Sequence, residues 1–233
     1  MKTKFYKHAN VIFGATTMLF CYCCYLISTY APSPLNVYLW VLVSIICVLS
    51  GIAFGTHLTK LNESVNKDPL TGLKNRNYFF SQMNIEVARY KKTQSDISLL
   101  IVDIDNFKHI NDTYGHTTGD KAIIKIADIL IQNIRTTDTV ARIGGEEFAI
   151  ILPNTNLQGA YALVERMRVA VEKIIFCCGN DSFKVTISAG VATMYGNFEI
   201  SQLIDLADKA LYKAKETKNS ISTMEDVATG INR

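Results

Sequence analysis

Two carboxylates at the end of a buried strand are the first sign of chemistry in this sequence. The run Leu-Leu-Ile-Val-Asp-Ile-Asp at 99–105 predicts a strand that ends in Asp103 and Asp105. Because side chains alternate along a strand, the two carboxylates share one face. The stability of a strand does not require such a pair, which therefore indicates a ligand-binding role.

A second acidic pair follows two glycines. Gly144-Gly145 stand between apolar runs, which predicts a tight two-residue hairpin turn, where glycine adopts positive φ values without steric cost. No side chain would shield this turn, so a nucleotide could lie against its backbone. Glu146 and Glu147 begin the outgoing strand and should point to opposite faces, which offers at least one carboxylate to a ligand. Taken alone, these four residues also fit an ordinary exposed turn.

The elements that position these residues follow from the spacing of apolar side chains. The expected helices cover 77–92, 119–134, 157–174 and 200–217, and the expected strands cover 97–103, 139–143, 147–152, 183–193 and 220–223. This order is a βαββαβ core with additions. In such a core the outgoing strand of the hairpin inserts beside the first strand and antiparallel to it, which brings Asp103 next to Glu146. Two converging carboxylates repel each other, and a hard cation such as Mg²⁺ between them is the simplest resolution.

Together these motifs resemble the GGDEF family of diguanylate cyclases, in its GGEEF form. Other motifs of the family recur in order across roughly 68–220, including the DxLTGLxNR entrance that begins at Asp68 and the polar, glycine-rich series 107–120. The resemblance implies an α+β, palm-like fold of the nucleotide-cyclase type. It also implies synthesis of cyclic di-GMP from GTP.

The resemblance further implies a metal site and a base-recognition site. Asp103, the carbonyl of Ile104 and Glu146 would hold the Mg²⁺ or Mn²⁺ ions that bind the GTP triphosphate. Glu147 would lie behind these ligands or help to activate the attacking hydroxyl.

Asn111 and Asp120 would read the guanine edge, and a carboxylate suits guanine because it accepts from the N1 and N2 donors. Lys108 would face the phosphates, and the Gly144-Gly145 backbone would lie against the nucleotide.

The closing AKxxGRN motif of the family is matched only in part, since Ala-Lys-Glu-Thr-Lys-Asn at 214–219 is one residue short. Lys215 keeps its phosphate-binding position. Lys218 serves as the second phosphate-binding cation only if the chain shortens there, and lysine lacks the bidentate fork of arginine. A solvated helix face explains the two lysines about equally well.

The segment Arg135-Thr-Thr-Asp138 precedes the hairpin at an offset that resembles the family's RxxD inhibitory site, where product dimers bind. An arginine can stack on or fork to a guanine, and an aspartate can accept from it. Without the resemblance, the segment would be an ordinary charged loop.

The N-terminal quarter predicts a membrane anchor. Residues 8–59 contain no Lys, Arg, Asp or Glu, and spans of about 11–30 and 35–56 are long enough to cross a bilayer as helices. A cleaved signal peptide is disfavoured because the first apolar run is too long. We therefore expect an anchor at 1–56, a helical linker at 57–67 and a catalytic domain at 68–233. The linker is either a short coiled coil or a helix continuing from the second span.

Lysines flank the two spans on one side, at Lys2, Lys4 and Lys7 before the first and at Lys60 and Lys67 after the second. This placement predicts a multi-pass protein of the bacterial cytoplasmic (inner) membrane, with both termini and the catalytic domain in the cytoplasm. The connection between the spans is too short for a folded sensor, so any signal must enter through the spans.

Composition excludes other classes. The 24 basic and 21 acidic side chains are too nearly balanced to indicate a nucleic-acid partner. The six cysteines are expected to be free thiols, and the four histidines have no zinc-binding spacing.

The leading hypothesis is a diguanylate cyclase that condenses two GTP into cyclic di-GMP and two pyrophosphates. Each domain would hold one GTP, and the 3′-hydroxyl of one would attack the α-phosphate of the other, which requires a homodimer. A catalytically silent receptor that binds cyclic di-GMP through Arg135 and Asp138 is the alternative, weakened by the intact carboxylates. A cyclase that makes cyclic AMP is disfavoured because Asn111 and Asp120 match guanine-reading positions.

Overall fold

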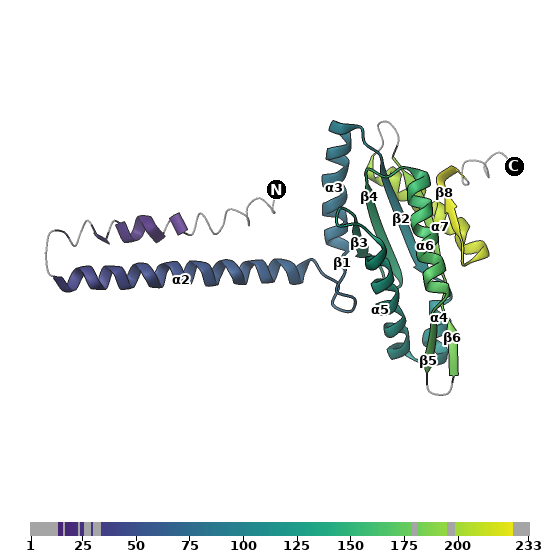
Figure 1. Ribbon diagram of the computed structural model, residues 1–233, viewed down its shortest axis with the longest axis horizontal. Coiled ribbons are helices and arrows are strands. Elements are labelled where there is room, and N and C mark those ends of the chain that lie inside the picture. Colours follow the sequence, from purple (N-terminus) through teal and green to yellow (C-terminus); the bar gives the residue numbers. More distant parts are fainter. Residues whose placement is uncertain are drawn as a thin grey trace. The chain divides into compact units, whose positions relative to one another are not determined.

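The computed structural model describes residues 14–15, 17–22, 24–25, 29, 34–178, 181–194 and 199–225, with the backbone alone at 34–37, 39–40 and 57–64. The chain divides into two compact units, residues 1–65 and 66–233 (Figure 1). The boundary falls within the segment 57–67 that the sequence predicts to be a linker.

The first unit contains one long helix, α2 (Pro34–Val65), preceded by helical residues between 14 and 25. The backbone of α2 is continuous through the predicted second span and on into the predicted linker. Among the described residues, none of the helices has both the length and the apolarity needed to cross a membrane. Part of the predicted first span, 11–30, lies outside the described residues. The predicted second span, 35–56, lies on α2. Both spans stay predictions.

A six-stranded mixed sheet with strand order β1-β3-β4-β2-β7-β8 forms the centre of the second unit. Its strands are β1 (Lys74–Asn75), β2 (Ile97–Ile104), β3 (Thr139–Arg142), β4 (Glu147–Pro153), β7 (Ile187–Thr193) and β8 (Ile221–Thr223). β2 lies between β4 and β7 and is antiparallel to both, which confirms the predicted insertion of the outgoing hairpin strand beside the first strand. The outer pairs β1–β3 and β7–β8 are parallel.

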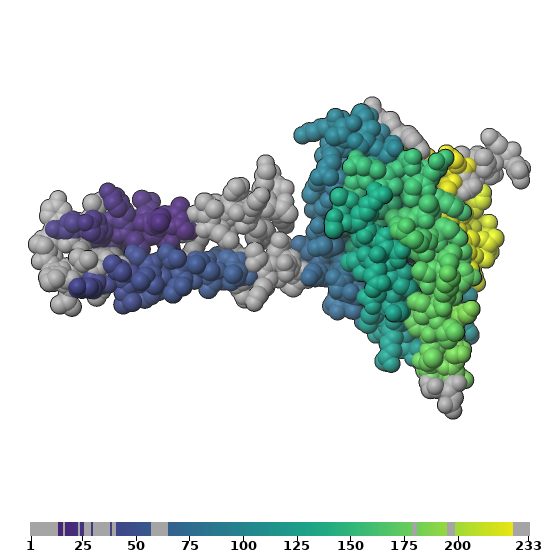
Figure 2. Space-filling model, in the orientation of Figure 1, coloured from purple at the N-terminus to yellow at the C-terminus, as the bar shows by residue number. Residues whose placement is uncertain are grey.

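Helices cover both faces of this sheet, so the central strands are buried on both sides. Side chains alternate along β2: Leu99 and Ile101 pack with α3 (Arg76–Thr93) and α7 (Ile200–Thr217). Leu100 and Val102 pack with α5 (His116–Asn133) and α6 (Leu157–Glu172). Figure 2 shows α5 and α6, in teal and green, forming one continuous surface over their face. The predicted βαββαβ order is therefore confirmed.

Three elements were not predicted from the sequence, namely the helix α4 (Phe107–Tyr114), the two-residue β1 and the strand β5 (Ile175–Cys178). β5 forms a separate hairpin with β6 (Asp181–Lys184), which overlaps the start of the strand predicted at 183–193. The helix α4 buries only Phe107 and Ile110, which gives too few apolar residues for a clear period.

The prediction of one strand over 183–193 is wrong, because the chain breaks between β6 and β7. At the break, the Thr186 carbonyl accepts from the Asp105 N–H at 2.9 Å. The side chain of Thr186 also donates to the Asp105 carboxylate at 2.8 Å. The strand ends where Thr186 turns to bind this carboxylate.

Candidate functional site

The β2–β4 ladder brings three carboxylates to one edge of the sheet. Asp103 lies directly opposite Glu147 in the register, and the Ile104 N–H donates to the Glu146 carbonyl at 3.3 Å. Asp103 and Glu146 are close enough that each carboxylate disfavours the charge of its neighbours. We call Asp103, Glu146 and Glu147 the carboxylate edge.

The glycine turn beside this edge differs from the prediction. The Ile143 N–H donates to the Glu147 carbonyl at 2.9 Å, so three residues, 144–146, form the connection. The positive-φ residues of the described chain do not include Gly144 or Gly145, so the predicted two-residue turn is wrong. Glycine is needed at 144 for another reason: a Cβ there would lie 3.2 Å from Glu147 Cβ and would meet the Glu147 carboxylate.

The turn is held from outside by Arg142. Its guanidinium donates to the Gly145 carbonyl through Nε at 3.2 Å and Nη2 at 2.7 Å. Nη1 also forms an ion pair with the Asp68 carboxylate at 3.1 Å. Burial alone would raise the pKa of Asp68, but hydrogen bonds from Thr71 and Arg142 outweigh it and hold that pKa below its usual value. The family-like entrance at Asp68 and the glycine turn are thus one connected structure.

Lys215 reaches the carboxylate edge from α7. Its Nζ donates to Asp103 Oδ1 and, at 3.0 Å, to the Ile104 carbonyl, and it pairs with Asp105 at 3.2 Å. Two predicted metal ligands therefore converge on one ammonium group. Hard oxygen donors that converge on a cation suit Mg²⁺ or Mn²⁺, so the residues present fit the ion that the family implies. The sequence predicted that Lys215 contacts phosphate and did not foresee that it binds these carboxylates.

Electrostatics show that this edge is short of positive charge. Burial raises the pKa of Asp103; Lys215 opposes that rise, while Glu147 and Asp105 add to it. Burial, followed by repulsion from Asp103, also raises the pKa of Glu146. A cation bound here would stabilise the charged form of both carboxylates and lower their pKa values.

Asp105 lies one residue beyond the end of β2 and has a different role from Asp103, although Lys215 contacts both. The residue is only 3% exposed. It accepts from Thr186 Oγ1, Ser188 Oγ and the Asn219 N–H, each at 2.8 Å. With these protein donors in place, Asp105 is a structural carboxylate that fixes the chain around the edge.

A hydrogen-bonded network links this carboxylate to α6. Arg168 binds both Glu165 oxygens at 2.8 Å, and its Nη1 donates to Glu172 at 2.9 Å and to Asn219 Oδ1 at 2.7 Å. The N–H of the same Asn219 binds Asp105. This arginine network was not predicted from the sequence, where its only signal is the helical spacing of the two glutamates around Arg168.

The shortened closing motif places Lys218 at the end of β2. Lys218 and Asn219 have φ of 57° and 44°, left-handed values that are uncommon outside glycine. The Lys218 Nζ donates to Asn106 Oδ1 at 2.7 Å, one residue beyond the buried Asp105. Lys218 and Lys215 therefore lie at the same end of the sheet.

The residues predicted to read guanine lie where α4 meets α5. Asn111 Oδ1 is buried and has no hydrogen-bond partner in the described part of the chain. Gly119 packs against this amide, since a Cβ there would lie 3.1 Å from Asn111 Cγ. Asp120 follows at once and is exposed, as is Lys108 on α4. A buried acceptor without a donor requires an explanation, and a ligand N–H would supply one.

The Arg135–Asp138 segment forms a closed turn before β3. The Asp138 carboxylate accepts from the Arg135 N–H at 2.9 Å and from Thr137 Oγ1 at 3.2 Å. Arg135 is exposed, and no described residue forms an ion pair with its guanidinium.

A mixed sheet between helix pairs, with carboxylates at the end of its central antiparallel strands, defines a cyclase-like α+β domain. Residues 65–220 match the family described as "Diguanylate cyclase, GGDEF domain". The chain belongs to this family.

Known relatives agree with this assignment. The chain is 40% identical over 163 residues to "Diguanylate cyclase DgcP" of Pseudomonas aeruginosa, covering 70% of this chain and 24% of that protein. It is 37% identical over 227 residues to "Probable diguanylate cyclase DgcT" of Escherichia coli, covering 92% and 49%. The matches thus span half or less of these two proteins. The crystal structure of the GGDEF domain of DgcB from Caulobacter crescentus in complex with c-di-GMP is 32% identical, with a TM-score of 0.67, over 69% of this chain and 94% of that one.

Proposed function

We propose that this protein is a diguanylate cyclase that condenses two GTP into cyclic di-GMP and two pyrophosphates. The observation that carries the proposal is the convergence of Asp103 and the Ile104 carbonyl on one ammonium group, beside Glu146, in a GGDEF-family fold. One relative is named a diguanylate cyclase and another a probable diguanylate cyclase, and these names support the same activity.

The carboxylate edge would hold the metal ions through Asp103, the Ile104 carbonyl and Glu146. Mg²⁺ or Mn²⁺, when bound, supplies charge neutralisation for the triphosphate. Lys215 would exchange its carboxylate partners for phosphate oxygens, with Lys218 close by. Glu147 would help to remove the proton from the attacking 3′-hydroxyl. The new bond joins this 3′-oxygen to the α-phosphorus, and the bond from that phosphorus to the pyrophosphate oxygen breaks.

Base selection would come from the α4–α5 junction. Asn111 Oδ1 has no described donor and would accept from a guanine N–H, and the exposed Asp120 would accept from the N1 and N2 donors. Lys108 would face the phosphates, and the backbone at Gly144 and Gly145 would lie against the nucleotide. Because one domain binds one GTP, two copies of the chain must face each other to join the nucleotides.

Product would bind at Arg135 and Asp138 and restrain synthesis. The exposed guanidinium of Arg135 supports this site, because no described residue forms an ion pair with it. Its paired N–H groups could donate to the acceptor atoms of a guanine. A silent receptor would use the same site, but that reading gives the carboxylate edge no role.

The N-terminal unit would anchor the protein as a two-helix hairpin in the inner membrane, with both termini in the cytoplasm. The absence of charge over 8–59 and the flanking lysines support this topology. A C-terminal alkaline phosphatase fusion should stay in the cytoplasm and therefore be inactive. A C-terminal fluorescent fusion should be bright. An active phosphatase would contradict the hairpin.

The activity is tested by incubating the full chain in membranes with GTP and Mg²⁺ at several protein densities. We expect cyclic di-GMP, formed at a rate that rises faster than linearly with protein density, as dimerisation requires. Binding of cyclic di-GMP without synthesis would favour the receptor. Cyclic AMP made from ATP would overturn the guanine assignment.

A further inference from the structure

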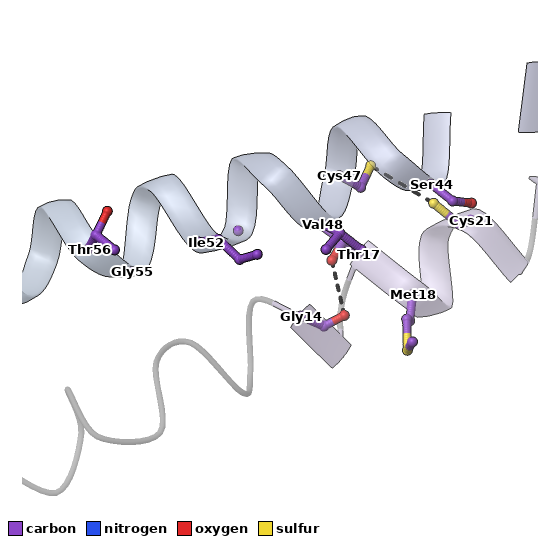
Figure 3. A pocket seen from close by; sticks show the side chains of 11 residues that line it. Gly14, Thr17, Met18, Cys21, Ser44, Cys47, Val48, Ile52, Gly55 and Thr56 are labelled. Atoms are coloured by element: carbon purple, nitrogen blue, oxygen red, sulfur yellow. Dashed lines mark hydrogen bonds between the residues drawn. The ribbon is translucent and has the colours of Figure 1, made fainter. Parts of the chain in front are cut away.

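A cavity of about 570 Å³ lies in the first unit, between the helical residues that begin at Gly14 and the middle of α2 (Figure 3). Its size falls within the range of small-molecule sites. Most of its lining is apolar and comes from residues such as Val48 and Ile52, while Gly51 and Gly55 contribute no side chain. The glycines leave room for the cavity because they place no side chain in it.

Two thiols face each other at this cavity. Cys21 Sγ donates to Cys47 Sγ at 3.9 Å, and both residues line the cavity (Figure 3). Both are free cysteines from helical segments 26 residues apart in sequence. Cys24 is also a free cysteine of the first segment, but it does not line the cavity. This difference makes Cys24 a natural control.

We propose that Cys21 and Cys47 form an oxidisable dithiol, and that a lipid-soluble quinone bound in the cavity converts it to a disulfide. A disulfide holds its sulfurs about 2.05 Å apart, so the two sulfurs must approach by roughly 2 Å. Rotation about the Cα–Cβ bonds moves a sulfur by that amount without unwinding a helix. The proposal rests on the membrane anchor proposed above and does not depend on the cyclase activity.

The chemistry of the lining selects the oxidant. Burying a charged or strongly polar molecule in an apolar cavity without partners costs free energy, which excludes glutathione disulfide. A quinone is apolar, fits the volume and accepts two electrons. Two S–H bonds break and one S–S bond forms, while both electrons and both protons pass to the quinone, which leaves as the hydroquinone.

The experiment uses the full chain in membranes that have been treated with a chelator and a reductant, then washed. A short-chain ubiquinone is added, and the remaining thiols are counted by the mass added with a maleimide polymer. We expect the parent to lose two of its six reactive thiols. Dithiothreitol should restore both, and proteolysis should yield one peptide in which Cys21 is linked to Cys47.

Variants assign the loss to this pair. Cys21→Ser and Cys47→Ser should each lose no thiol to the quinone, and Cys24→Ser should still lose two. If Cys21→Ser lost as many thiols as the parent, or if the linked peptide contained Cys24, the proposal would be overturned. Failure of the parent to lose any thiol would overturn it as well.

A cavity-filling variant tests the quinone step separately from the thiols. Val48→Trp keeps both cysteines but places a bulky ring in the cavity. Oxidation by the quinone should be roughly tenfold slower, as expected for one bulky group in an apolar pocket. Oxidation by diamide, added from the water, should be unchanged. An equal quinone rate in parent and Val48→Trp would show that the cavity does not bind the oxidant.

Discussion

Two charged clusters in the same domain treat their carboxylates in opposite ways. At the carboxylate edge, burial and repulsion from neighbouring carboxylates raise the pKa values of Asp103 and Glu146. In the arginine network, the hydrogen bond from Arg168 holds the pKa of Glu165 below its usual value. Bonds from Asn219 and then Arg168 do the same for Glu172. The first cluster is short of positive charge, and the second has its charges paired.

This difference separates binding from structure. A carboxylate that is costly to ionise reduces the stability of the folded chain, and it persists where a ligand will use its charge. A carboxylate paired within the protein stabilises the fold and has little left to offer a ligand. The two clusters are joined through Asn219 and Asp105, so the arginine network fixes the position of the carboxylate edge.

The sharpest way to break this comparison is to neutralise one carboxylate in each cluster. Glu146→Gln should lower cyclic di-GMP synthesis by at least about 100-fold, because it removes a charge held for the metal. Its free energy of unfolding should not fall, since the lost charge is destabilising. Asp103→Asn should lose activity likewise.

Glu172→Gln is the matched control, since its amide can keep a hydrogen bond to Asn219 or Arg168, and it should retain most activity. Synthesis rates and urea denaturation provide both measurements. Near-normal synthesis by Glu146→Gln at limiting Mg²⁺ would remove the metal assignment.

Arg135 belongs to neither cluster: it is exposed, and no described residue forms an ion pair with it. Arg135→Ala should leave initial synthesis unchanged and weaken product inhibition by about 10- to 100-fold, the effect of losing a charge-assisted bond of roughly 1.5 to 3 kcal/mol. GTP turnover is measured against added cyclic di-GMP, with Thr136→Ala as the control in the same turn. Identical inhibition curves for parent and Arg135→Ala would make the segment an ordinary loop.

Arg168 tests the paired cluster. Arg168→Ala should lower the free energy of unfolding by about 1 to 3 kcal/mol, because it leaves Glu165 and Asn219 without their donor. The apparent affinity for Mg²⁺ should also fall, because Asn219 no longer fixes Asp105.

Lys209→Ala breaks an ion pair whose side chains are 57% and 59% exposed, and it should cost at most about 1 kcal/mol. Arg168→Lys should recover part of the stability. If Lys209→Ala and Arg168→Ala had equal stability and equal Mg²⁺ affinity, the arginine network would have no special structural role.

The smallest expected effect is a dependence on pH that has opposite signs in the two clusters. A raised folded pKa means that the folded chain binds more protons than the unfolded one, so Glu146 destabilises most at high pH. Glu146→Gln should therefore exceed the parent in stability at pH 8, and the difference should shrink as pH falls through the raised pKa.

For Glu165, whose pKa is lowered, stability present at pH 8 is lost as pH falls through the folded pKa. Glu165→Gln should accordingly approach the parent in acid. Urea denaturation of both variants, from pH 8 down to a pH below the lowered pKa of Glu165, measures the two trends. Parallel trends would contradict the division into paired and unpaired clusters. Higher Mg²⁺ should also shift the acid limit of synthesis to lower pH, because metal and protons compete for the same oxygens.

The sequence by itself determined the order of the core and the position of the carboxylates. Alternation in a strand depends on neighbouring residues only, so the run at 99–105 was enough to place Asp103 and Asp105 on one face. Helical periodicity was likewise enough for α3, α5, α6 and α7, whose apolar faces repeat over several turns. It was not enough for α4, where only Phe107 and Ile110 are buried.

Only the tertiary structure decided how the surroundings of the two aspartates differ. Asp105 is satisfied by Thr186, Ser188 and Asn219, and no local pattern shows that these donors meet it. Lys215 reaches Asp103 across 112 residues of sequence, and Arg142 joins the glycine turn to Asp68 across 74 residues. Contacts between distant segments form only when the sheet and helices pack, and for that reason their chemistry cannot be read from local sequence.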